Sequence, residues 1–75
     1  MARNIYDVSP TGDDWKVQKR GDAAPLSTFA NKDDAVTYGR SVAKANQPSQ
    51  LVVRRADGTI ETEYTYEDDP FPPPG

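Results

Sequence analysis

The stretch from Asn31 to Asn46 carries the chain's one convincing helix pattern, and this limits the folds that the chain can adopt. Asn31 is a favourable N-cap, and acids in the first turn suit the positive end of the helix dipole. Small apolar residues recur at helical spacing along one side, namely Ala35, Val36, Gly39, Val42 and Ala43. Such a stripe lets a helix lie close against its partner, which we predict is a β-sheet built from the flanking segments.

The flanking segments have the composition of β-strands separated by turn residues. Asp57-Gly58 between two β-prone runs predicts a hairpin, and a five-residue loop is expected between the first two strands. The predicted strands are Asn4 to Ser9, Trp15 to Arg20, a short Leu26 to Ala30, Gln50 to Arg55 and Ile60 to Glu67. The order β-β-(β)-α-β-β predicts an α+β fold, with an antiparallel sheet of four to five strands and one helix on one face.

Residues 1–67 are expected to form a single small α+β domain, followed by a proline-rich C-terminal tail at 68–75. Alternation in the last strand predicts that Ile60, Thr62, Tyr64 and Tyr66 share a face. We expect Phe71 to anchor the tail, either on its own domain or on a partner. The predicted core residues are Trp15, Val17, Phe29, Val36, Val42, Val53, Ile60 and Tyr64.

The 75 residues carry a net charge of −3 and include no cysteine and no histidine. These absences exclude Ser-His and Cys-His catalytic groups and zinc fingers. We therefore expect no enzymatic activity and no cofactor. With no leader-like segment and no apolar run long enough to cross a membrane, the expected location is the cytoplasm, with no membrane partner.

Two acidic clusters, Asp13-Asp14 and Glu67-Asp68-Asp69, offer oxygen ligands for Mg²⁺ or Ca²⁺. Their spacing matches no cation-binding loop, and runs of surface acid are usually solvated. We expect no metal site.

Short motifs follow one another along the chain in a characteristic order. They are Tyr6-Asp7-Val8-Ser9-Pro10, Trp15-Lys16-Val17, Gly21, Phe29 with Lys32 and Ala35, Asp57-Gly58-Thr59-Ile60, and Tyr66, Asp69, Pro70, Pro72, Pro73 and Gly75. This order resembles a family of small uncharacterised bacterial, archaeal and phage proteins, the domain of unknown function 2188. The resemblance implies a compact sheet-and-helix fold and supplies no catalytic residues. In this chain Glu67-Asp68 replaces an expected Gly-Asn, and Asp13-Asp14 precedes Trp15 where small residues are common.

One helix covers only one face of such a sheet, so the second face needs its own explanation. If Tyr6, Leu51 or Val52 and part of the tyrosine row were exposed there, the protein would self-associate. We therefore expect a non-enzymatic module that acts by protein–protein contact, with self-association or an unknown protein partner.

The alternative is nucleic-acid binding through the exposed sheet face, as in phage or mobile-element proteins. The acidic net charge argues against it. The possible interaction residues for either function are Lys16, Gln18, Arg20, Arg54, Arg55 and Phe71.

Overall fold

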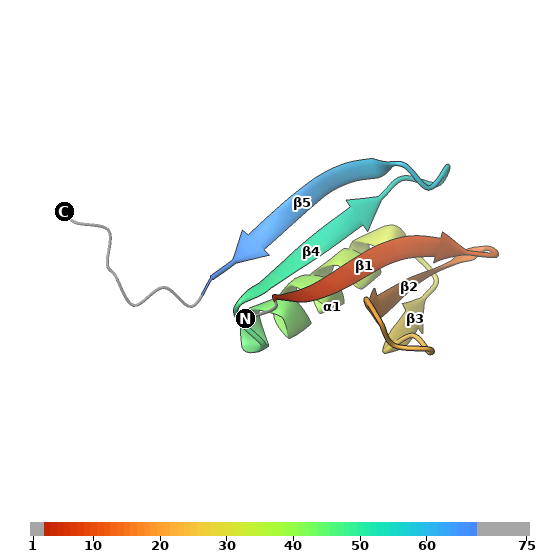
Figure 1. Ribbon diagram of the computed structural model, residues 1–75. Helices are drawn as coiled ribbons and strands as arrows, with labels where there is room; N and C mark the ends of the chain where they lie inside the picture. Colours follow the sequence, from red (N-terminus) through yellow and green to blue (C-terminus); the bar gives the residue numbers. More distant parts are fainter. Residues whose placement is uncertain (1–2, 68–75) are drawn as a thin grey trace.

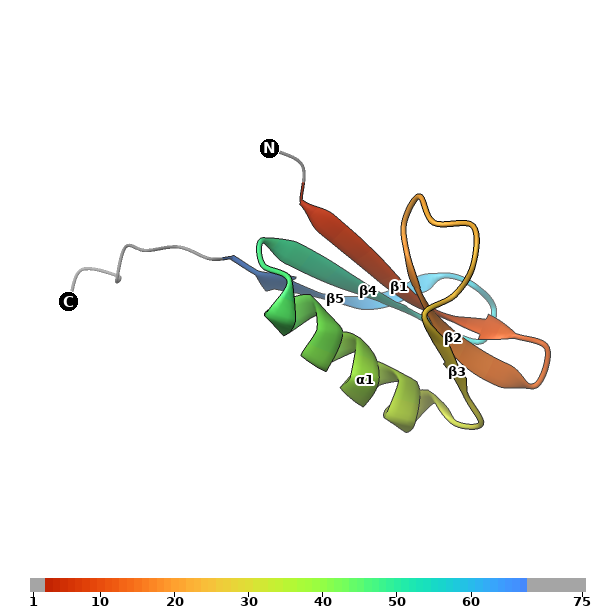
Figure 2. The ribbon, with the colours of Figure 1, turned by 90° about the horizontal axis from the view of Figure 1, so that it is seen from below.

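The computed structural model describes residues 3–67, which form one twisted sheet with a single helix packed on one face (Figure 1). Figure 2 shows the two layers, with the helix running along the underside of the sheet. The elements are β1 (Asn4–Thr11), β2 (Asp14–Lys19), β3 (Ser27–Phe29), α1 (Lys32–Ala45), β4 (Ser49–Arg54) and β5 (Ile60–Tyr66).

The five strands lie in the order β3-β2-β1-β4-β5. The predicted α+β fold with one helix on one face is confirmed, but the expectation of a purely antiparallel sheet is wrong. The central pair, β1 and β4, is parallel, and the other three pairs are antiparallel. Parallel neighbours require a crossover connection. Here α1 supplies it, because it carries the chain from the β3 edge back across the sheet to the far side of β1.

The helix begins and ends where the sequence predicts. The side chain of Asn31 accepts a hydrogen bond of 2.9 Å from the backbone N–H of Asp34, which satisfies one free donor of the first turn. At the other end, the backbone N–H of Asn46 donates to the carbonyl of Ala43 at 3.1 Å. The side chain of Asn46 also donates from Nδ2 to the carbonyl of Val42 at 2.8 Å, so an asparagine side chain caps each end of the helix.

The stripe of small residues brings α1 close to the two central strands. Ala35, Gly39 and Ala43 are the buried residues of the helix. A Cβ on Gly39 would lie 2.9 Å from Cδ1 of Leu51 and 3.2 Å from Cγ2 of Val8. Both contacts are closer than carbon atoms normally approach. Glycine at this position therefore sets the spacing between the helix and the sheet.

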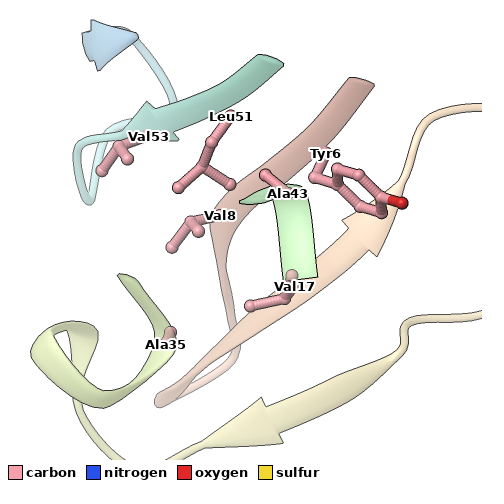
Figure 3. Packing of buried hydrophobic residues seen from close by; sticks show 7 residues of the cluster. All are labelled: Tyr6, Val8, Val17, Ala35, Ala43, Leu51 and Val53. Atoms are coloured by element: carbon pink, nitrogen blue, oxygen red, sulfur yellow. The ribbon is translucent and has the colours of Figure 1, made fainter. Parts of the chain in front are cut away.

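The core lies between α1 and the strands β1, β2 and β4 (Figure 3). Among the predicted core residues, Val17 and Val53 are buried, and all the others except Ile60 are partly buried against them. Tyr6 and Leu51, which we expected on the second face, point toward the helix and are 4% and 0% exposed. The centre of the core therefore lies on the parallel β1–β4 pair, and the partly buried predicted core residues on β2, β3, α1 and β5 surround it.

Ile60 is 46% exposed, so its assignment to the core is wrong. The cause is a β-bulge: Val53 pairs with Thr62 but Arg54 pairs with Ile60, which leaves Glu61 as an extra residue in β5. A bulge reverses the alternation of side chains on one side of it. Glu61 therefore reaches Lys32 at the start of α1, where the two form a salt bridge.

The β1–β2 loop is tighter than the five residues predicted. β1 continues through Pro10 to Thr11, so only Gly12 and Asp13 connect the strands, and Gly12 has a φ of +62°. Glycine adopts this conformation without steric cost. Pro10 is accommodated because β4 pairs with β1 only as far as Val8.

Replacing Gly39 with valine should destabilise the protein by about 1–3 kcal/mol, because the new side chain collides with Leu51 and Val8. Ser41→Val adds the same side chain at an exposed position of the same helix and should change stability by less than about 0.5 kcal/mol. Urea denaturation followed by circular dichroism measures both. Equal stability of the two variants would contradict the close-packing account.

The Glu61–Lys32 pair should make part of the stability depend on pH. The hydrogen bond and charge of Lys32 hold the pKa of Glu61 below its ordinary value of 4.5. A carboxyl whose pKa is lowered by folding stabilises the folded state above its unfolded pKa and loses that contribution as the pH falls through the folded pKa. Glu61→Gln and Lys32→Gln should each reduce the loss of stability on acidification, measured as urea midpoints between about pH 7 and about pH 3. An unchanged acid dependence in both variants would contradict this.

Candidate functional site

The sheet face opposite α1, here called the open face, carries a hollow lined by charged side chains. Alternation along β1, β2 and β4 turns Asp7, Lys16 and Arg54 away from the core. These residues line an open hollow of about 520 Å³. We call it the basic hollow, and its residues are Asp7, Ser9, Lys16, Gln18, Lys19, Arg20, Gly21 and Arg54.

Asp7 lies at the centre of the basic hollow and fixes two guanidinium groups. Arg20 donates to it from Nη2 at 2.9 Å and from Nε at 3.3 Å, one bond to each carboxylate oxygen. Arg54 reaches the same carboxylate from the neighbouring strand, with 3.6 Å between Nη2 and Oδ1. The Asp7 side chain is only 19% exposed. Charge-assisted, two-pronged pairing of this kind holds side chains in a defined geometry.

The basic hollow has an excess of positive charge. On the open face it is lined by three basic side chains, Lys16, Arg20 and Arg54, and one acid, Asp7. Lys19 pairs with Tyr6, whose side chain points toward α1, so alternation turns the Lys19 side chain away from the open face. Within residues 3–67, Lys16 takes part in no salt bridge. Its ammonium group is therefore available to a ligand in this part of the chain, while the two arginines are already oriented by Asp7.

The open face is polar, so the expectation of an exposed apolar second face is wrong. Val52 does lie on this face, but it is only 4% exposed. It sits in register between Asp7 and Glu63, and Gln50 beside it donates a hydrogen bond to Glu63. Among residues 3–67 the large apolar side chains that are exposed are Leu26, directly before β3, and Ile60, at the start of β5, so they lie at opposite edges of the sheet.

The structure brings together four of the six predicted interaction residues: Lys16, Gln18, Arg20 and Arg54. Arg55 is separate, because its guanidinium donates to the hydroxyl of Thr59 at 3.4 Å and to the carbonyl of Ile60 at 3.1 Å in its own hairpin. Phe71 lies outside the described residues.

The sequence interpretation missed Asp7 and Ser9 as members of the site. Asp7 lies between Tyr6 and Val8, so alternation alone places it on the face opposite the core. Its role became visible only with the pairing of β1 to both β2 and β4. That pairing puts Arg20 and Arg54 on either side of the carboxylate.

Other features of the described residues are weaker candidates for a functional site than the basic hollow. A shallow surface of about 580 Å³ lies along α1, but all of its lining residues come from that single helix, so no groups converge there. Within 3–67, no set of three acidic side chains is arranged to hold a metal ion. No helix in this part of the chain is long and apolar enough to cross a membrane.

The fold and the site define a small α+β protein whose helix-free sheet face carries a charged hollow. The chain belongs to the family described as "Uncharacterized protein conserved in bacteria (DUF2188)", whose model matches residues 6–66. This confirms the predicted family, although the match ends before most of the proline-rich ending.

One curated relative is an uncharacterized protein, YycD, from Bacillus subtilis (strain 168), which is 30% identical over 63 residues. The alignment covers 81% of this chain and 94% of the relative. No solved structure matches the chain.

Replacing Asp7 with asparagine should lower stability by about 1 kcal/mol, since one carboxylate holds both arginines. The loss should shrink at high salt, where exposed charges are screened. Asp13→Asn removes the same charge from an exposed turn and serves as the control. Urea denaturation at low and high salt measures the difference, and identical behaviour of the two variants would show that Asp7 does not organise the hollow.

Proposed function

We propose that this protein is a non-enzymatic interaction module that binds an acidic segment of a partner protein in the basic hollow. The observation that carries the proposal is the convergence of three basic side chains onto one hollow: Lys16 from β2, Arg20 directly after β2, and Arg54 from β4. The two arginines are held in place by Asp7, so binding does not have to pay for ordering them. Lys16 supplies charge that is not neutralised within residues 3–67.

The environment of the carboxylate in the basic hollow supports a non-enzymatic role. Acid–base catalysis needs a carboxyl or an amine that is free to exchange a proton within a sheltered pocket. The basic hollow is open to solvent, and its one carboxylate is already bound by two guanidiniums. Binding therefore fits the site better than proton transfer.

A protein segment fits the hollow better than a nucleic acid. A phosphate backbone is normally bound by a long basic stripe on a basic protein. Here the positive charge is confined to one hollow with a carboxylate at its centre, and the sequence carries a net charge of −3. Glu63 on β5 adds negative charge to the same face. A short acidic peptide covers the hollow without meeting this charge.

The test is binding of two probes of matched charge, a short polyglutamate peptide and a short single-stranded DNA oligonucleotide, measured by NMR titration of the full chain. We expect polyglutamate to shift the amide signals of Lys16, Gln18, Arg20 and Arg54, and to bind more weakly as salt rises. Arg54→Gln should weaken binding several-fold, since charge-assisted bonds are lost. Arg55→Gln is the matched control, because Arg55 bonds within its own hairpin.

Two results would overturn the proposal. The oligonucleotide could bind in the hollow more tightly than polyglutamate, with affinity falling steeply as salt rises, which would favour the nucleic-acid alternative. Alternatively, neither probe could shift signals of the hollow, which would remove it as a binding site.

A further inference from the structure

The chain itself contains an acidic segment of the kind that the basic hollow would take. Glu67 follows β5 directly, and Asp68 and Asp69 come next. Glu67 is already paired with Arg3, at 3.2 Å between Nη2 and Oε2. The two aspartates are therefore the acids on which an intermolecular contact would depend. Their charge complements that of Lys16.

The root of this segment is held on its own domain. The hydroxyl of Tyr66 accepts a hydrogen bond of 3.1 Å from Nε of Arg40, and Glu67 is paired with Arg3. Fixing the residues just before the aspartates reduces the entropy lost when those aspartates bind. It also fixes the edge of the sheet from which they start.

From that edge the aspartates cannot reach Lys16 of the same chain. One row of paired residues crosses the four strands β2, β1, β4 and β5, and it consists of Val17, Val8, Val53 and Thr62. Lys16 lies one residue beyond this row, on the side away from Glu67. Five residues from Thr62 to Glu67 and one from Val17 to Lys16 span about 20 Å along the strands, and three strand spacings add about 14 Å across, which gives a separation of roughly 24 Å. The Cα of Asp69 lies at most about 7 Å from that of Glu67. Extended side chains do not close the difference. Arg20 lies nearer to that edge, but its guanidinium is already paired with Asp7.

We infer that Asp68 and Asp69 of one copy occupy the basic hollow of a second copy. The inference rests on the proposed function and names its partner: the acidic segment belongs to this same chain. In a two-fold symmetric dimer the contact is reciprocal: the acidic segment of each copy binds in the basic hollow of the other copy. The association is electrostatic and therefore sensitive to salt.

The first experiment measures solution mass by light scattering over a range of concentrations, at about 10 mM and about 1 M salt, where the Debye length is about 30 Å and about 3 Å. We expect a dimer that dissociates at high salt. Asp68→Asn combined with Asp69→Asn should weaken dimerisation roughly tenfold at low salt, because several exposed charge pairs are lost at once. Lys16→Gln should weaken it as well, whereas the control Lys44→Gln on α1 should not.

A second experiment separates contacts between copies from contacts within a copy. Lys16→Asp and Asp68→Lys each place like charges together, so neither variant alone should dimerise. When the two variants are mixed, the heterodimer pairs opposite charges at both hollows, and dimerisation should return. A contact within one chain gives no recovery on mixing.

The outcomes distinguish this inference from the proposed function. A protein that stays monomeric at every concentration and salt level overturns the inference. So does a dimer that is insensitive to these variants or to mixing, since its interface then lies elsewhere. The proposed function is tested separately by the binding of polyglutamate. If polyglutamate binds in the hollow but the protein does not dimerise, the acidic segment belongs to a different protein.

Discussion

The rest of the structure depends on the close contact of Gly39 with Val8 and Leu51. This contact lets α1 lie low across the parallel β1–β4 pair and bury the side chains at its centre. A larger residue would raise the helix and open the layer that contains most of the apolar surface. Residues 3–67 contain one helix, and the sequence has no cysteine to form a disulfide, so this part of the chain has no second core to compensate.

The presence of a single helix also explains why the open face is polar. One helix shields one side of five strands, so the other side must be stable in water. The chain achieves this with side chains that pair across strands: Asp7 with Arg20 and Arg54, and Gln50 with Glu63. Their stems and their neighbours cover Val52, which is nearly as buried as the true core. The charges that make this face soluble are also the charges that could recognise a partner.

Features determined by nearby residues could be predicted from the sequence. The helix ends at Asn31 and Asn46 follow from capping chemistry, and the Asp57-Gly58 turn follows from the φ of +90° that glycine provides. The parallel pairing of β1 with β4 could not be predicted in this way, because it joins residues that are distant in the chain. The one available signal was the continuous apolar run Leu51-Val52-Val53, which is typical of a central strand covered on both faces.

In the candidate site, too, the features set by nearby residues could be predicted and those set by strand pairing could not. Alternation in β2 correctly places Lys16, Gln18 and Arg20 together, since period two is a local property. It could not show that Arg54 joins them while its neighbour Arg55 does not, because that depends on which strand lies beside β4. The bulge at Glu61 is a further example: one extra residue sends Ile60 to the open face and gives Lys32 its partner. What turns three scattered basic residues into one site is therefore the position of Asp7 on the central strand, between β2 and β4.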